Sequence, residues 1–224
     1  MTSLLLDTAL KMDGLKFLRE IPDNYTPLVI FDPQYRGVLD KLAYGNEGAR
    51  QKGRAALPQM TTDTISNFAR EIARILKPSG HCFLWMDKFH LCTGDLRRIF
   101  ERNGDGNLGM QVVDMLTWSK GRIGMGYRTR GMGEYMLTIQ KQPIRAKGVW
   151  TDHGIPDVWI EKVADRTHVH EKPTMLVRRL IRAVTKSGDI VVNPCAGSFG
   201  TMAAALATGR HFLGCDINGP LRAP

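Results

Sequence analysis

Short apolar runs alternate along the chain with segments whose apolar residues keep helical spacing. Leu28-Val29-Ile30-Phe31 is continuously apolar and predicts a strand buried on both faces of a parallel sheet. From Thr64 to Leu76 the apolar residues recur at helical spacing, which predicts an amphipathic helix that Lys77-Pro78-Ser79-Gly80 ends. The same reasoning predicts strands at 81–86, 112–118, 135–140, 190–192 and 212–217, and helices at 90–103, 173–184 and 198–207. This alternation is typical of an α/β fold with a mainly parallel sheet.

Length and composition fit one domain spanning residues 1–224. No stretch approaches the roughly 18 apolar residues of a membrane span, and no basic region precedes the apolar N-terminal start. No pair of the four cysteines has metal or redox spacing, and Cys82 and Cys215 lie in apolar runs typical of a core. We therefore expect a cytoplasmic protein with reduced thiols, without a membrane segment or a metal site; His153, His168 and His170 also lack metal-ligand spacing.

The net charge of +9 and the pI near 9.6 favour a polyanionic partner. The charge is concentrated, because residues 36–54 carry +3 and residues 119–147 carry +6, which leaves the rest of the chain neutral. Five glycines between Gly121 and Gly133 predict a mobile basic loop, and residues 36–60 and 141–170 are expected to be irregular. Concentrated charge suits phosphate binding, although solvated basic loops give the same pattern.

Three strand ends carry distinctive polar residues, and ligands bind at the carboxyl ends of strands in such a sheet. In Asp32-Pro33-Gln34-Tyr35 the carboxylate can accept hydrogen bonds from an amino group and the tyrosine can stack on a base. The small residues of 193–201 let backbone N–H groups approach a ligand, and without a Gly-Lys-Ser/Thr they do not form a triphosphate loop. Asp216 ends the next strand, where an acid commonly binds ribose hydroxyls. Each of these features also has an ordinary structural explanation. Residues 32–35 can be a turn, residues 193–201 a tight connection from strand to helix, and Asp216 a helix cap.

Together and in this order, these features resemble the β-class amino-methyltransferases of DNA, the permuted group whose catalytic motif precedes the cofactor motif. Asp32-Pro33-Gln34-Tyr35 is similar to the family's Asp-Pro-Pro-Tyr, and 193–201 is similar to Asp-Pro-Phe-x-Gly-Ser-Gly-Thr. His170-Glu171-Lys172-Pro173 resembles the motif that packs on the methionine end of the cofactor, and Asp13 matches an acid that contacts its adenine. The resemblance implies a circularly permuted, Rossmann-like methyltransferase fold with helices on both faces of the sheet. A strand near Leu10–Met12 would then lie beside the last strand and complete the domain.

The resemblance also implies site residues. The catalytic candidates are Asp32, Pro33, Gln34 and Tyr35. The candidates for binding S-adenosylmethionine are Asp13, Asp32, His170, Lys172, Pro173, Asn193, Cys195, Ala196, Gly197, Ser198, Gly200, Thr201, Asp216 and Ile217. The candidates for DNA contacts, on loops about 36–60 and 119–169, are Arg36, Arg50, Lys52, Arg54, Lys120, Arg122, Tyr127, Arg128 and Arg130. Three positions depart from the family pattern: Gln34 replaces proline, Asn193 replaces aspartate and Phe199 occupies a glycine position.

The expected activity is site-specific transfer of a methyl group to adenine N6 of a base flipped out of double-stranded DNA, by a homodimer and without a covalent intermediate or metal. An aspartate at the first catalytic position favours adenine in this family. Cytosine N4 and RNA are alternative targets. The three departures support another class, a non-catalytic DNA-binding protein with a decayed methyltransferase site. A small-molecule methyltransferase fits the fold but leaves the clustered charge unexplained.

Overall fold

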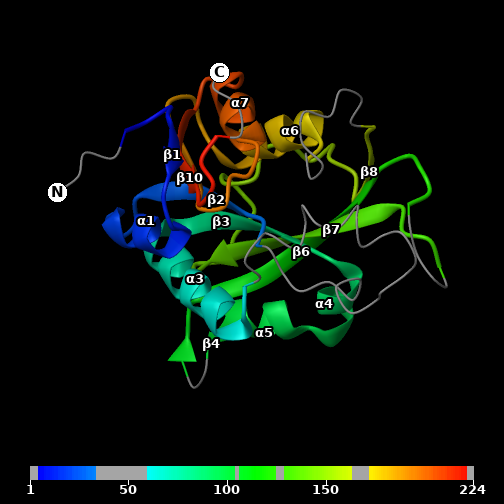
Figure 1. The fold of residues 1–224 in the computed structure, drawn as a ribbon, viewed down its shortest axis with the longest axis horizontal. Coiled ribbons are helices and arrows are strands. Elements are labelled where there is room, and N and C mark those ends of the chain that lie inside the picture. Colours follow the sequence, from blue (N-terminus) through cyan, green and yellow to red (C-terminus); the bar gives the residue numbers. More distant parts are fainter. Residues whose placement is uncertain (1–4, 34–59, 104–105, 125–128, 163–171, 221–224) are drawn as a thin grey trace.

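The computed structural model describes residues 5–33, 60–103, 106–124, 129–162 and 172–220. Its main feature is an eight-stranded sheet with the strand order β1-β10-β9-β2-β3-β7-β6-β8 (Figure 1). The strands are β1 (Ala9–Lys11), β2 (Thr26–Phe31), β3 (Leu76–Met86), β6 (Met110–Ser119), β7 (Gly133–Lys141), β8 (Val158–Ile160), β9 (Ile190–Asn193) and β10 (His211–Asp216). The first five in this order are parallel to one another, β7 is antiparallel to both β3 and β6, and β8 is parallel to β6. A separate short hairpin joins β4 (Arg102–Asn103) and β5 (Gly106–Asn107).

Helices cover both faces of the sheet (Figure 1). One face carries α1 (Gly14–Glu20), α3 (Thr62–Ile75), α4 (Lys88–Thr93) and α5 (Asp95–Glu101), and the other carries α6 (Thr174–Val184) and α7 (Gly200–Leu206). Successive residues of a strand point to opposite faces. In β2, Val29 and Phe31 therefore join the core under α1 and α3, whereas Leu28 and Ile30 join the core under α6 and α7. Burial on both faces explains why this strand is continuously apolar.

The expected α/β architecture is confirmed, but the structure differs from the expectation in several segments. The helix expected at 90–103 is two helices, because Gly94 takes a left-handed conformation (φ +67°) between α4 and α5. β3 begins at Leu76 instead of His81: the ladder to β2 continues across an irregularity that takes in Lys77-Pro78-Ser79-Gly80. The segment expected to be irregular at 141–170 contains β8, which pairs with the end of β6.

The first and last strands lie side by side, as the resemblance implied. β1 pairs with β10 in parallel, with Ala9 opposite Gly214 and Lys11 opposite Asp216. The circular permutation itself, a statement about relatives, stays a prediction. Cys82 and Cys215 are fully buried in the core, as expected. Across the described ranges, no helix is long and apolar enough to cross a bilayer.

Candidate active site

The carboxyl ends of β1, β10, β9 and β2 meet at one edge of the sheet because these strands are parallel. Asp32 follows β2, Asn193 ends β9 and Asp216 ends β10. A pocket opens at this edge between the strand ends and the starts of α6 and α7. It is lined by Ile30, Asp32, Trp85, Lys172, Thr174, Val177, Asn193, Cys195, Ala196, Gly197, Ser198, Gly200 and Thr201.

Hydrogen bonds shape the loop from Asn193 to Thr201. The side chain of Asn193 accepts from the Cys195 N–H at 2.9 Å and donates to the Thr201 hydroxyl at 3.0 Å. The Gly197 N–H donates to Oδ2 of Asp216 at 3.0 Å, so the end of β10 holds the middle of the loop. The Asn193 amide therefore supplies both an acceptor for the loop backbone and a donor for Thr201.

Phe199 fills its glycine position without entering the pocket. Its backbone is left-handed (φ +58°), a conformation that a bulky residue rarely adopts. The ring is 5% exposed and lies edge-on to Phe212, with ring centroids 6.1 Å apart. Packing in the core therefore offsets the backbone strain, and the cofactor loop keeps the turn that glycine would allow.

Helix α1 brings Asp13 to the same edge. The Asp13 side chain caps this helix by accepting from the Lys16 N–H at 2.9 Å. The next residue, Gly14, permits the close approach, because a Cβ there would lie 2.5 Å from the carbonyl oxygen of Pro194. Burial raises the pKa of the Cys195 thiol, and the nearby carboxylates of Asp216, Asp32 and Asp13 raise it further. Acids that follow β1, β2 and β10 thus surround one loop.

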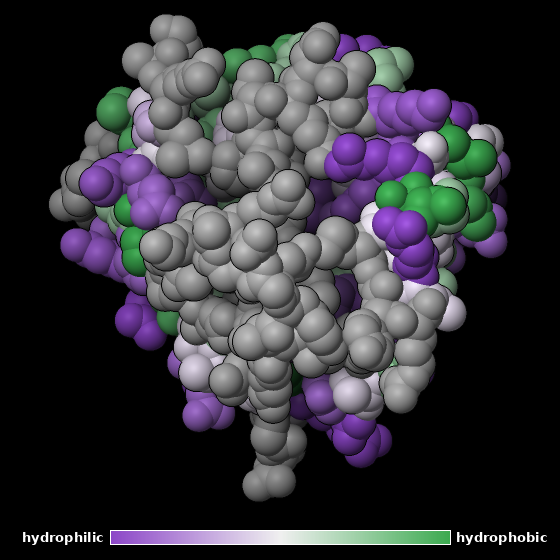
Figure 2. All heavy atoms as spheres, turned by 45° about the vertical axis from the view of Figure 1, so that its right-hand side comes forward, coloured by the Kyte–Doolittle hydropathy of each residue, from purple (hydrophilic) through white to green (hydrophobic). Residues whose placement is uncertain are grey.

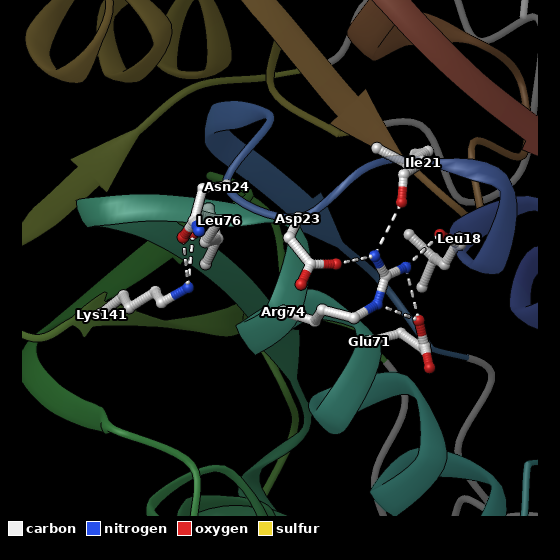
Figure 3. A network of polar contacts seen from close by, with 8 residues as sticks. All are labelled: Leu18, Ile21, Asp23, Asn24, Glu71, Arg74, Leu76 and Lys141. Carbon is white, nitrogen blue, oxygen red and sulfur yellow. Dashed lines mark hydrogen bonds and ion pairs between the residues drawn. The ribbon is translucent and has the colours of Figure 1, made fainter.

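Arg74 of α3 fixes the other end of α1 (Figure 3). Its guanidinium donates to the carbonyl oxygens of Leu18 and Ile21, both at 2.8 Å, and also pairs with Asp23 and Glu71. These bonds satisfy carbonyl groups at the C-terminal end of the helix and add a favourable positive charge there. Nearby, Lys141 of β7 bonds the Leu76 carbonyl and the Asn24 side chain, which ties the same corner to the sheet (Figure 3).

Asp32 is joined to a chain of alternating charges. The Lys172 ammonium lies 2.9 Å from Oδ2 of Asp32 and 2.9 Å from Oε2 of Glu134. The other oxygen of Glu134 pairs with Lys120. Lys172 also lies over the Trp85 ring, 4.9 Å from its centroid, a distance suited to a cation–π contact. The side chains of Asp32, Glu134 and Lys172 are only 21–29% exposed, so the chain of charges is largely shielded from water.

Burial and the neighbouring charges act in opposite directions on the pKa values of these groups. It raises the pKa of Asp32 above its usual range, with the Lys172 charge acting against this rise and the Glu134 charge adding to it. Burial alone would also raise the pKa of Glu134, but the charges and hydrogen bonds of Lys172 and Lys120 outweigh it and lower that pKa to about 2. Burial disfavours the charged form of Lys172, yet the two carboxylates more than compensate and raise its pKa. Lys172 and Glu134 therefore stay ionised at neutral pH.

The start of α6 places Lys172, and Glu161 fixes that start. Pro173, the residue before the helix, offers no side-chain cap. Instead the Glu161 carboxylate accepts from the N–H groups of Met175 at 2.9 Å and Leu176 at 3.0 Å, and also from the Trp159 indole N–H at 2.7 Å. An acid at this position suits the positive end of the helix dipole.

The face beside the site carries part of the expected DNA surface. Arg122 and Arg130 are exposed between β6 and β7, and the Arg130 guanidinium donates to the Gly124 carbonyl at 2.9 Å. Lys120 differs from them, because it is half-buried against Glu134. Figure 2 shows hydrophilic side chains beside an exposed hydrophobic patch on one side of the molecule. Two residues of β8, Val158 and Ile160, are among the exposed apolar residues, at 50% and 73% exposed.

The structure thus brings together much of the expected site. One pocket is lined by Asp32, Lys172 and seven candidates of the 193–201 loop. Asp13 and Asp216 lie behind this loop, and the buried Pro173 follows Lys172 in the chain. Ile217 is half exposed and is not among the lining residues. The remaining candidates lie outside the described residues. They are Gln34, Tyr35 and His170, and the DNA candidates Arg36, Arg50, Lys52, Arg54, Tyr127 and Arg128.

Sequence reasoning missed Trp85 and Glu134. Trp85 lies near the end of β3, where the rule about parallel strand ends could have found it. Glu134 begins a strand, and its position became clear only from the antiparallel pairing of β7 with β3. Among the described residues, no group of three or more His, Cys, Asp or Glu side chains could hold a metal ion.

Comparison with known proteins agrees with this geometry. Residues 27–220 match the family described as DNA methylase, which joins N6 and N4 methyltransferases. The chain belongs to this family. It is 48% identical over 208 residues to the Type II methyltransferase M.HhaII of Haemophilus parahaemolyticus, covering 92% of this chain and 89% of that protein.

Two solved structures share the fold. The M1.HpyAVI–SAM complex has a TM-score of 0.64 at 18% identity, over 92% of this chain and 90% of that one. The cytosine-N4-specific PvuII DNA methyltransferase has a TM-score of 0.66 at 17% identity, over 92% and 80%. The Rossmann-like methyltransferase fold implied by the sequence is therefore confirmed.

Proposed function

We propose that this protein transfers a methyl group from S-adenosylmethionine to adenine N6 in double-stranded DNA. One observation carries the proposal: the Asp32 carboxylate, at the end of β2, lines the same pocket as the glycine-containing loop 193–201. An acceptor for an amino group and a cradle for a cofactor thus share one cavity. Membership of the DNA methylase family and the 48% identity to a Type II methyltransferase support this assignment and a role in restriction–modification.

The residues present fit S-adenosylmethionine. The small side chains of Ala196, Gly197, Ser198 and Gly200 leave the backbone of the loop accessible, and acids from three strand ends favour a positively charged ligand nearby. We assign the ribose hydroxyls to Asp216 and the adenine to Asp13, as the family resemblance implies. When bound, the cofactor supplies an electrophilic methyl group on its sulfonium.

The acceptor side is supplied by Asp32 and Pro33. Lys172 takes one oxygen of Asp32, and we assign the other oxygen and the Pro33 carbonyl to the two N–H groups of the target amino group. Accepting both hydrogens favours a pyramidal nitrogen whose lone pair is free to attack. The target base must leave the duplex at a cost of a few kcal/mol, offset by stacking on Tyr35 worth roughly 1–3 kcal/mol. The protein therefore acts by alignment and electrostatics, without a covalent intermediate.

Adenine N6 is proposed over cytosine N4 because aspartate opens the catalytic tetrapeptide. A segment of 51 residues, 23% of this chain and 17% of that protein, is 51% identical to the DNA adenine methyltransferase YhdJ of Escherichia coli and supports adenine. Cytosine N4 is the second candidate, favoured by the fold similarity to the PvuII enzyme. Mass spectrometry of nucleosides from DNA exposed to the protein separates N6-methyladenine from N4-methylcytosine. The same measurement on RNA exposed to the protein tests whether RNA is a substrate.

Replacing Asp32 tests the assignment. Asp32→Asn keeps the shape of the side chain but puts a donor where an acceptor is needed, so methyl transfer should fall by about a hundredfold or more. Cofactor affinity, measured by calorimetry, should be at least partly retained. Undiminished transfer would contradict the assignment, and an inactive wild-type protein that still binds DNA would favour the decayed-site alternative.

Two further expectations accompany the proposal. The homodimer is testable by sedimentation of the protein with and without a DNA duplex. The cytoplasmic location stays a prediction.

A further inference from the structure

In the proposed function, only Asp32 and Pro33 accept the hydrogens of the target amino group. The structure nevertheless connects Asp32 to Lys172, Glu134 and Lys120 through a chain of ion pairs. We propose that Glu134 is a positioning residue for methyl transfer, which holds the Lys172 ammonium against one oxygen of Asp32 so that the other oxygen faces the target amino group. This inference rests on the proposed function and adds a residue to its machinery.

Strand direction explains why Glu134 can do this. β7 is antiparallel to β3, with Tyr135 opposite Met86, so the start of β7 lies at the edge where the parallel strands end. Glu134 lies opposite Trp118 in the neighbouring ladder, and its two oxygens divide between Lys120 and Lys172. Glu134 is therefore held on a rigid strand, which is a more exact support than a loop.

Lys172 needs such a support because its side chain is long and rotatable. A lysine ammonium is a point charge on a flexible stem and contacts a carboxylate without fixed geometry. Here three groups restrict it: Asp32 at 2.9 Å, Glu134 at 2.9 Å and the Trp85 ring at 4.9 Å. Without Glu134 the ammonium keeps its attraction to Asp32 but loses its second anchor, and the orientation of the Asp32 carboxylate is no longer determined.

Charge balance supports the same role. Two carboxylates and two ammonium groups form the chain, so Lys120 and Lys172 together neutralise Glu134 and Asp32. The alternative is that Glu134 only stabilises the fold while Lys172 serves the cofactor. The two roles differ in one respect: a positioning residue that acts through Lys172 has no effect once Lys172 is removed.

A double-mutant cycle tests this difference. Single-turnover methyl transfer with saturating cofactor and duplex DNA is measured for the wild type, Glu134→Gln, Lys172→Met and the double variant. Glu134→Gln should slow transfer about tenfold in the wild type and less than about twofold when Lys172 is methionine, because misplacement of a catalytic group costs rate. Cofactor affinity of Glu134→Gln should stay within about threefold of the wild type, since only transfer is affected.

The matched control is Glu101→Gln. Glu101 is 25% exposed and pairs with Arg97 at the end of α5, away from the pocket, so its rate should equal that of the wild type. Equal losses for Glu134→Gln in both backgrounds, or no loss in the wild type, would overturn the proposal.

A second readout needs no activity. Acylation of Lys172 by an amine reagent, followed by mass spectrometry, is compared with acylation of the exposed Lys147. Glu134→Gln should raise the Lys172 rate about fivefold relative to Lys147, since a lost anion lowers the lysine pKa and frees the amine. Unchanged labelling of Lys172 would overturn the anchoring role of Glu134, whether or not the protein transfers methyl groups. A wild-type protein that transfers no methyl groups would contradict the proposed function and leave the labelling result to be judged separately.

Discussion

Asp32 differs from a surface carboxylate because burial and a neighbouring acid oppose its ionisation. Lys172 counteracts both effects, with a smaller contribution from Lys120, so these lysines favour the ionised form of the proposed acceptor carboxylate. In the acceptor role, only the ionised form has both oxygens available to donors. Residue-level electrostatics therefore sets the pH range in which methyl transfer proceeds.

The rate of transfer should fall as the pH drops through the pKa of Asp32. Because this pKa is raised, the fall should occur at a pH above about 3.9, the pKa of a free aspartate. Lys172→Met should move this acid limb to higher pH, because the Lys172 charge lowers the pKa of Asp32. Single-turnover rates across pH for both proteins check the direction. An acid limb that stays in place would contradict the coupling between the two residues.

Phe199 combines a strained backbone with a buried ring. Phe199→Gly relieves the strain of a left-handed residue but removes an aromatic side chain from the core, so the free energy of unfolding should fall by about 2–3 kcal/mol. Phe199→Ala keeps the strain and should cost about 1 kcal/mol more. Urea denaturation of the three proteins measures both differences. A Phe199→Ala variant as stable as the wild type, in which the strain is kept and only the ring is lost, would show that the ring contributes nothing.

At the scale of elements, strand directions and helix starts place the polar groups. Five parallel strands end at one edge, while β7 begins there because it runs the other way. Helices α6 and α7 start at the same edge and present their N-termini to the pocket. For α6 the cap comes from Glu161 on the neighbouring segment, so the β8 region and the position of Lys172 are linked.

Glu161→Gln should lower the free energy of unfolding by about 1–2 kcal/mol, because an amide nitrogen would face N–H donors at the start of α6. Transfer should slow as well, since Lys172 is two residues before this helix. Denaturation and single-turnover rates check both effects. Asp95→Asn is the control: Asp95 also opens a helix, but it is 54% exposed, and its replacement should change stability by less than about 0.5 kcal/mol.

At the scale of the whole molecule, the +9 charge lies in two segments. Residues 36–54 follow the proposed catalytic residues in the chain, and residues 119–147 include Lys120 and Glu134 of the chain of charges. Within the described part of the second segment, Arg122 and Arg130 are exposed, whereas Lys120 balances Glu134. The net positive charge available to phosphates is therefore smaller than the count of basic residues. The rest of the chain contributes no net charge.

Replacing both Arg122 and Arg130 by alanine should weaken DNA binding and reduce the slope of log K against log salt by about 2, if each arginine contacts one phosphate. Binding to a labelled duplex over a range of salt concentrations measures the slope. Arg97→Ala is the control, because Arg97 is exposed on α5 away from the site. An unchanged slope in the double variant would remove these arginines from the DNA surface.

Much of this architecture could be predicted from the sequence because it depends on local patterns. Continuous apolar runs such as Leu28–Phe31 identify buried parallel strands, and helical periodicity identified α3 and α6 within two residues. Boundaries failed where single residues override the pattern, as Gly94 does between α4 and α5. Phe199 illustrates the same limit, since nothing local shows that a phenylalanine can take a left-handed turn when its ring is buried against Phe212.

The sequence by itself determined the order of most of the elements, though not α1 or β8, and the polar loops at the ends of parallel strands. It therefore placed Asp32, Asn193 and Asp216 at one edge, because parallel strands end together. Only the tertiary structure decided that Glu134 and Trp85 complete the surroundings of Lys172. The physical reason is that strand pairing and side-chain charge contacts join residues far apart in the chain, and no periodicity in the sequence records which way β7 runs beside β3.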